Sequence, residues 1–351
     1  MYDRALRGQM SPFRVADCHL HFEGSLPVDL LEALARRAGH RFADRTAFEA
    51  ERSAVRDRTG FLALFGEVCG LFRSPSDYGE AARAVARSIG EGGAAYAEVY
   101  VSPEISARFG LDPAACLMAV DRGFREAEAE GVTRCRILLD AVRQWGPQSA
   151  ERVLDLHERT RLPSVVGFGL GGDERAAPAA AFAGVYLRAR ALGLRTSVHA
   201  GEWDGVESLR EALDHLRPDR IDHGIAAVAN PRLLARLAEE STALWVAPTS
   251  NAVTGAVDQI ENHPLPRLLD SGVCVALGAD DPLLFATTTS REYAVARETF
   301  GFGARTMTLL AENSWRASFC SLEDRNRAAT GGGSGPLRSR REGPSQPSVA
   351  S

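Results

Sequence analysis

The sequence of 351 residues contains no lysine, so arginine supplies all 41 of its basic residues. This absence excludes enzymes that form a Schiff base through lysine, phosphate loops that end in GK[ST], and metal pairs bridged by a lysine carbamate. The six cysteines are scattered and form no CxxC pair. Their spacing favours reduced thiols and a cytoplasmic protein over a disulfide framework.

Long apolar runs are also missing. No run approaches the ~18 residues that a membrane span needs, and the first residues lack the apolar core of a secretory signal. The net charge is only −5, which makes nucleic acid and anionic membranes unsuitable partners. We therefore expect a small-molecule substrate, no nucleic acid and no membrane, while association into a homo-oligomer is compatible with the sequence.

Short apolar segments alternate along the chain with longer segments of helical period. Eight such repeats predict an α/β protein, a (β/α)8 TIM barrel whose parallel strands are buried on both faces. A doubly wound open sheet is the alternative, but it needs fewer strands, and no GxGxxG follows the first strand. The expected strands span residues 14–19, 95–101, 135–139, 164–169, 195–199, 220–223, 243–247 and 273–277.

We interpret residues 1–329 as one barrel domain with a long insertion. Residues 41–76 form an overlong, phenylalanine-rich connection after the first strand, which predicts a helical lid over the pocket. A small helix pair packed outside the barrel is the alternative. Residues 330–351 are rich in Gly, Ser, Pro and Arg, and they predict a disordered tail.

Polar residues gather at the C-terminal ends of the predicted strands, where TIM barrels carry their active sites. The first strand ends in HLH, the fifth in HAGE, the sixth in DHG and the eighth in GADDP. His19 and His21 are two residues apart on a strand, so both imidazoles point to one side and can reach one cation. Surface or capping roles are expected for the other four histidines, which are His40, His157, His215 and His263.

These clusters predict a single metal site with an open position for water, because each has a commonplace alternative but all four lie on one face. Imidazole and carboxylate ligands suit zinc or a similar divalent ion, and the missing lysine argues against a bridged pair. We expect one Zn²⁺ per chain, which would lower the pKa of a bound water from about 15.7 to about 7. The expected ligands are His19, His21, His199 and one aspartate of GADDP.

The ordered set HLHFEGSL, GLGGDE, HAGE, RIDHG, PTSN and GADDP resembles the adenosine deaminase family of the amidohydrolase superfamily. The set runs from about residue 17 to 281 in the family's order. The resemblance implies a barrel enzyme that hydrolytically removes the exocyclic amine of a 6-aminopurine. The small zinc deaminases that use HxE with PCxxC have another scaffold, and this chain has no PCxxC.

The resemblance also implies roles for the reacting groups. Glu202 matches the acid that protonates purine N1, and His223 matches the histidine that orients the water and helps to remove its proton. An acid at N1 is what the chemistry needs, because attack at C6 pushes electrons toward N1. The matched metal ligands are His19, His21, His199 and Asp280.

Other matched positions are expected to bind the substrate. Asp281 matches the residue that binds N7, and the backbone N–H of Gly172 matches the donor to N3. Phe61, Leu62 and Phe65 are expected to supply part of an apolar wall. His21 is expected to contact the substrate as well as the metal, and Glu23 is expected at the mouth of the pocket.

Three positions depart from the pattern of adenosine deaminases. Glu23 stands where these enzymes typically have an aspartate that reaches the ribose, and Asp222 stands where many have glycine. Both resemble relatives that act on adenine or on 6-amino-6-deoxyfutalosine, whereas Ala247 in place of cysteine is a packing change. We rank the deamination of adenosine and deoxyadenosine first, those two substrates as alternatives, and a catalytically silent ligand-binding relative last.

Overall fold

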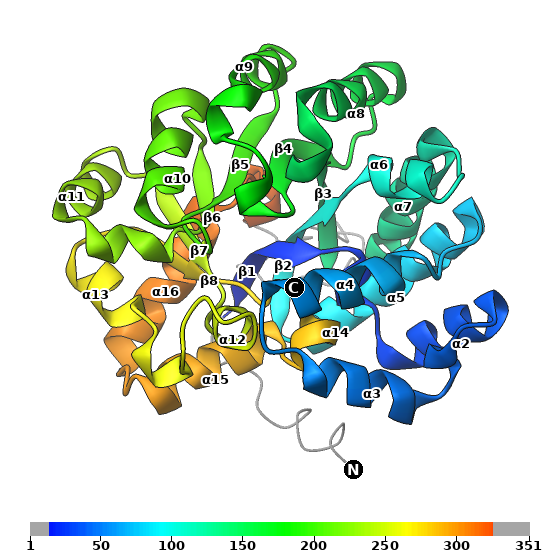
Figure 1. Ribbon diagram of the computed structural model, residues 1–351, viewed down its shortest axis with the longest axis horizontal. Helices are drawn as coiled ribbons and strands as arrows, with labels where there is room; N and C mark the ends of the chain where they lie inside the picture. The colour runs from blue at the N-terminus through cyan, green and yellow to red at the C-terminus, as the bar shows by residue number, and fades with distance from the viewer. Residues whose placement is uncertain (1–13, 326–351) are drawn as a thin grey trace, which may run out of the picture.

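A computed structural model describes residues 14–325 and forms one eight-stranded sheet in which consecutive strands pair in parallel. Figure 1 shows the strands at the centre of the molecule, inside a ring of helices. The predicted boundaries agree with the structure to within three residues. The strands are β1 (Val15–His21), β2 (Ala94–Val101), β3 (Arg134–Val142), β4 (Val165–Gly171), β5 (Arg195–Ala200), β6 (Arg220–His223), β7 (Ala243–Val246) and β8 (Val275–Leu277).

The sheet closes where the chain beyond β8 meets β1. Leu20 forms an isolated parallel bridge with Asp280. The N–H of His21 donates to the carbonyl of Asp280 at 3.0 Å, and the N–H of Asp280 donates to the carbonyl of His19 at 2.8 Å. The predicted (β/α)8 TIM barrel is therefore confirmed, and its seam lies at residues expected to bind metal.

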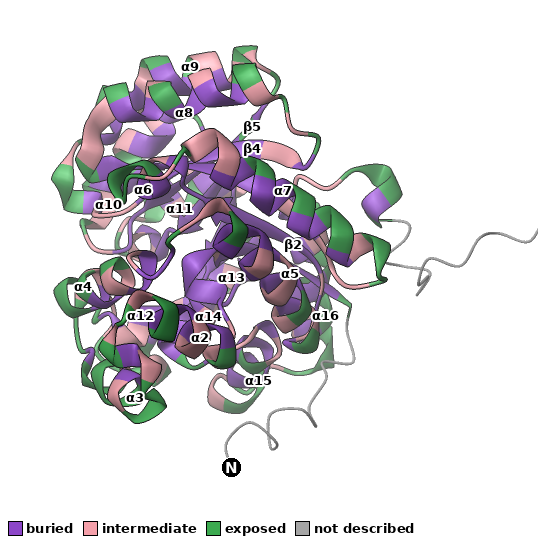
Figure 2. Cartoon of the chain, turned by 90° about the vertical axis from the view of Figure 1, so that its right-hand side faces the viewer, coloured by how far each residue is buried: buried purple, intermediate pink, exposed green. Residues whose placement is uncertain are grey.

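Helices cover the outside of the strands and turn their apolar sides inward (Figure 2). Among the described residues, no helix is long and apolar enough to cross a membrane. The α-helices are α2 (Val28–Ala38), α3 (Arg45–Ala54), α4 (Arg58–Cys69), α5 (Pro75–Glu91), α6 (Pro103–Arg108), α7 (Pro113–Ala129), α8 (Gly146–Thr160), α9 (Ala183–Ala191), α10 (Gly205–Glu211), α11 (Pro231–Glu239), α12 (Pro248–Val253), α13 (Leu265–Asp270), α14 (Pro282–Phe285), α15 (Thr289–Thr299) and α16 (Ala304–Ala317).

The predicted insertion at 41–76 contains α3 and α4. The Asp57 side chain accepts a hydrogen bond from the N–H of Gly60 at 2.8 Å, and this cap begins α4. Phe61 and Phe65 on α4 line the main cavity, so the insertion forms part of the pocket wall. A lid function would require motion and stays a prediction, and the tail predicted at 330–351 lies outside the described residues.

The four histidines away from the strand ends divide into two groups. His215 is exposed, and His40 accepts a hydrogen bond from the N–H of Phe42, as expected for surface and capping roles. His157 and His263 are buried, so a surface position is wrong for both, although His263 Nδ1 accepts the N–H of Leu265 at the start of α13, which is a capping contact. Helical or loop position alone did not reveal that His263 would face the interior, where it contacts Asn251.

Candidate active site

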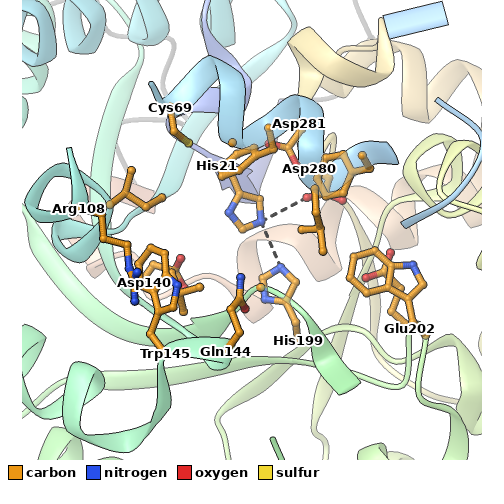
Figure 3. A pocket seen from close by; sticks show the side chains of 18 of the residues that line it. His21, Cys69, Arg108, Asp140, Gln144, Trp145, His199, Glu202, Asp280 and Asp281 are labelled. Atoms are coloured by element: carbon orange, nitrogen blue, oxygen red, sulfur yellow. Dashed lines mark hydrogen bonds and ion pairs between the residues drawn. The ribbon is translucent and has the colours of Figure 1, made fainter. Parts of the chain in front are cut away.

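Four side chains from three parts of the barrel converge at its C-terminal end. Figure 3 shows three of them, His21, His199 and Asp280. Nε2 of His199 lies 3.2 Å from Nε2 of His19 and 3.1 Å from Nε2 of His21. Oδ1 of Asp280 lies 3.5 Å from His19 Nε2 and 3.3 Å from His21 Nε2. All four ligand atoms lie within 4.8 Å of one another, as binding of a single cation requires.

The surroundings orient these ligands toward a common point. Nδ1 of His19 lies 3.0 Å from the carbonyl of Trp245, which fixes the proton on Nδ1 and leaves Nε2 free to bind a metal. Asp17 accepts hydrogen bonds from the backbone N–H groups of His19 and Ala279 and so ties β1 to the loop after β8. Three imidazoles and one carboxylate, oriented in this way, fit zinc or a similar divalent cation.

Glu202 lies beside this cluster on a loop held by another acid. The carboxylate of Glu174 accepts hydrogen bonds from the backbone N–H groups of residues 201–204, including that of Glu202 at 3.1 Å. Burial raises the pKa of the Glu202 carboxyl well above its usual range, and the charge of Asp280 adds to the shift. A buried, held carboxyl of this kind is suited to proton transfer.

His223 faces Glu202 across the site. Its Nε2 lies 3.3 Å from Glu202 Oε2 and 3.8 Å from Asp280 Oδ2. Burial lowers the pKa of His223 well below its usual value, with the nearby His19 contributing. His223 and Asp280 both have positive φ angles, of 65° and 60°, and such backbone strain is typical of functional residues.

Asp281 points into the cavity in a different direction from Asp280. It is 1% exposed, and neither of its carboxylate oxygens has a hydrogen-bond partner in residues 14–325. A Cβ atom at Gly24 would lie 1.6 Å from Asp281 Oδ1, so only glycine leaves room for this carboxylate. Two unpaired acceptors aimed into a cavity are available to bind a ligand N–H.

The cavity around these groups has a volume of about 260 Å³, near the lower end of the usual range of about 300–1,000 Å³ for ligand sites. Phe61, Leu62 and Phe65 line it as expected, and Gly172 does so with φ of 89°. Figure 3 shows Asp281 and Asp280 on one side of the pocket, opposite Gln144 and Trp145. The walls are apolar and the reactive groups lie together, which is typical of a small-molecule site.

Two predicted positions differ from expectation. Glu23 lies in the short helix η1 (Glu23–Ser25), is 2% exposed and is not among the described residues that line the cavity. The chain turns directly after β1, and Glu23 is buried in this turn, where its Oε1 has no hydrogen-bond partner among residues 14–325. Asp222 faces the barrel interior, where it accepts a hydrogen bond from Ser197 Oγ at 2.7 Å and lies 3.7 Å from His199 Nδ1.

The sequence analysis did not identify several residues that the structure places at the site. Asp140 at the end of β3 lines the cavity, and burial raises its pKa to about 7. Asn251 of the PTSN motif donates to Glu202 Oε1 at 3.2 Å. The GLGGDE motif was recognised for Gly172, but nothing in it indicated that Glu174 would bind four backbone N–H groups. The position of Asp140 at a strand end was the signal that could have identified it.

The sequence model of the adenosine deaminase family matches residues 15–330. The chain belongs to the adenosine deaminase family. An adenine deaminase from Chelativorans sp. (strain BNC1) is 38% identical over 90% of this chain and 95% of its own length. An aminodeoxyfutalosine deaminase from Streptomyces avermitilis is 36% identical over 90% of this chain and 88% of its own length.

Solved structures of this family agree with the fold. The adenine deaminase of Arthrobacter aurescens has a TM-score of 0.83 at 31% identity, covering 91% of this chain and 96% of that one. A zinc-bound amidohydrolase from Burkholderia ambifaria has a TM-score of 0.82 at 27% identity, covering 93% and 91%. This adenosine deaminase family member is a hydrolytic deaminase of an aminopurine with a candidate metal site.

The contact between Gly24 and Asp281 generates a prediction. Replacement of Gly24 by alanine should displace the Asp281 carboxylate and lower kcat/KM by about 10-fold or more, the cost of a lost charged hydrogen bond. Metal content should not change. Gly184→Ala on α9 is the control, because a Cβ there has no neighbour within 4 Å. Unchanged kcat/KM in Gly24→Ala, measured by steady-state kinetics, would contradict a substrate role for Asp281.

Proposed function

We propose that this enzyme hydrolyses free adenine to hypoxanthine and ammonia with one zinc ion per chain. The proposal rests first on Glu23. An aspartate at this position typically reaches the ribose in adenosine deaminases, but Glu23 is buried and does not line the cavity. The adenine deaminases that are 33–38% identical to this chain support the same alternative over adenosine.

Asp140 provides independent support for a free base. Its Oδ1 accepts the N–H of Gly171 at 3.1 Å, and no other described residue donates to its carboxylate. In Figure 3, Asp140 and Glu202 lie on opposite sides of His21 and His199. If Glu202 meets N1, the opposite side of the purine presents the five-membered ring. Adenine carries an N–H at N9, which a carboxylate can accept, whereas adenosine carries ribose there.

The proposed reaction adds water at C6 and releases the amine as ammonia. His19, His21, His199 and Asp280 would hold zinc, which supplies Lewis acidity and a more acidic water. Glu202 protonates N1 as electrons move toward it, and Asp281 accepts a hydrogen bond at the N7 edge. Gly172 lines the cavity, and its backbone N–H would donate to N3 and complete the recognition of the ring.

A second candidate substrate is 6-amino-6-deoxyfutalosine, which carries a large substituent at N9. Arg108 lines the same cavity, its guanidinium lies 4.0 Å from the centre of the Trp145 ring, and no described acid pairs with it. A cation on an aromatic face at the cavity edge suits an extended substrate. The Streptomyces avermitilis relative supports this candidate at 36% identity.

The substrate assignment is tested by comparing adenine, 9-methyladenine, adenosine and 6-amino-6-deoxyfutalosine. Adenine should have the highest kcat/KM. Asp140→Asn should keep the Gly171 bond through its oxygen and turn its NH2 group toward the ligand N–H. The kcat/KM of the variant should therefore fall by about 10-fold or more for adenine and change little for 9-methyladenine.

Asp121→Asn is the matched control, because Asp121 is also buried and accepts a backbone N–H, that of Ser164, away from the cavity. It should leave the ratio of the two kcat/KM values unchanged. A wild-type preference for adenosine or 6-amino-6-deoxyfutalosine would overturn the adenine assignment. If Asp140→Asn lowered kcat/KM equally for adenine and 9-methyladenine, Asp140 would not be the residue that recognises N9.

The ligand set predicts about one zinc per chain by elemental analysis, because the described residues bring together one such group. His19→Ala should abolish tight zinc binding and turnover, since Nε2 of His19 is one of the converging atoms. The barrel should remain folded by circular dichroism, because its core extends far beyond the site. Two tightly bound ions per wild-type chain would contradict the single site.

The role of Glu202 predicts that Glu202→Gln lowers kcat by about 10²–10⁴, the usual contribution of general acid catalysis. The glutamine keeps the shape of the side chain and cannot deliver the proton. Zinc content should equal that of the wild type, since Glu202 is outside the ligand group. Near-normal turnover in a zinc-loaded variant would show that another group protonates N1.

A further inference from the structure

A buried chain of hydrogen bonds connects the backbone at α13 to His223. The N–H of Leu265 donates to His263 Nδ1 at 3.1 Å, and His263 Nε2 lies 3.1 Å from Asn251 Oδ1. Nδ2 of Asn251 then lies 3.2 Å from Glu202 Oε1 and 3.0 Å from His223 Nδ1. His263 and Asn251 are 2% and 0% exposed, so solvent water cannot take the place of the hydrogen bonds that they form.

The direction of every bond in this chain follows from its first donor. A backbone N–H can only donate, so His263 Nδ1 must accept. Burial lowers the pKa of His263 to about 3, so the ring is neutral and its proton lies on Nε2. Asn251 Oδ1 must then accept from Nε2, which directs both N–H bonds of Nδ2 toward Glu202 and His223.

These directions determine which nitrogen of His223 carries the proton. Because Asn251 donates to Nδ1, a neutral His223 holds its proton on Nε2, the atom that faces Glu202 Oε2. The opposite tautomer would place an N–H against the Asn251 NH2 group. Rotation of the Asn251 amide would instead place its NH2 against the N–H of His263. Either rearrangement leaves two buried donors facing each other.

We propose that Asn251 and His263 are positioning residues that hold His223 as the Nε2–H tautomer. His223 then donates a hydrogen bond into the cavity and orients the attacking water, and it does not remove the water's proton at Nε2. This differs from the role in proton removal that the family resemblance implies for His223. The effect on turnover rests on the proposed function, whereas the tautomer itself does not.

The most direct test is Asn251→Asp, which keeps the size of the side chain. The carboxylate can still accept from His263 but cannot donate to His223 Nδ1 or to Glu202 Oε1, so His223 should move its proton to Nδ1. We expect kcat to fall by about 10², the usual cost of losing one oriented donor. KM should stay within about threefold, and zinc content should equal that of the wild type.

Variants at His263 test this series of hydrogen bonds without altering a residue beside the cavity. His263→Gln can donate to Asn251 Oδ1 and should retain kcat within about threefold, whereas His263→Leu lacks a donor and should lose about 10-fold. His157→Leu is the control, since it removes another buried histidine, on α8, and should leave kcat unchanged. Equal kcat values for His263→Gln and His263→Leu would overturn the proposal even if Asn251→Asp failed to fold.

The tautomer can be measured in the zinc-loaded wild-type enzyme by long-range ¹H–¹⁵N correlation of the histidine rings. The His223 signals are assigned by their loss in His223→Gln. We expect the Nε2–H pattern in the wild type and the Nδ1–H pattern in Asn251→Asp. An Nδ1–H pattern in the wild type would overturn the proposal. An enzyme inactive on every aminopurine would instead overturn the proposed function, and the spectrum would still decide the tautomer.

Discussion

The seam between β1 and the chain after β8 is the constraint on which the site depends. Two backbone hydrogen bonds join His19 and His21 to Asp280 across this seam, at 2.8 and 3.0 Å. The same bonds that close the barrel therefore bring two imidazoles and a carboxylate to one point. Asp17 reinforces the seam through hydrogen bonds to His19 and Ala279. Closure of the barrel therefore places three of the four candidate metal ligands, and the fourth, His199, comes from β5.

Adjacent carboxylates at this seam are kept apart by backbone geometry. Asp280 has φ of 60°, so the chain turns there, and Asp281 lines the cavity outside the group of four candidate ligands. Gly24 leaves the space that Asp281 occupies. Like charges this close are costly when both are ionised and buried, and ligands on both sides reduce that cost. A metal beside Asp280 and a ligand N–H beside Asp281 would each provide such compensation.

The sequence predicted those parts of the site that lie at the ends of the barrel strands. Strand ends are found from apolar runs, and any polar residue at a strand end faces the same rim, so His19, His199 and Asp280 could be placed together. Contacts made by loops could not be predicted in the same way. Glu174 and His263 accept hydrogen bonds from backbone N–H groups of loops, and no short sequence motif specifies the shape of these loops. Glu23 was expected at the mouth of the pocket, but η1 turns the chain just beyond β1 and the side chain is buried.

The arrangement separates chemistry from substrate choice. The reacting groups lie on β1, on β5 and the loop after it, on β6 and on the loop after β8, whereas Asp140 and Arg108 come from the β3 end and α6. The wall from α4 belongs to the long insertion, and the centre of its Phe65 ring lies 6.3 Å from the centre of the His21 ring. Under the proposed function, changes at Asp140, Arg108 or α4 would alter what is accepted at N9 while the four candidate metal ligands themselves stay the same. Under the proposed function, this division would let one barrel serve substrates that differ at N9, as the names of the adenine deaminase and aminodeoxyfutalosine deaminase relatives suggest for the family.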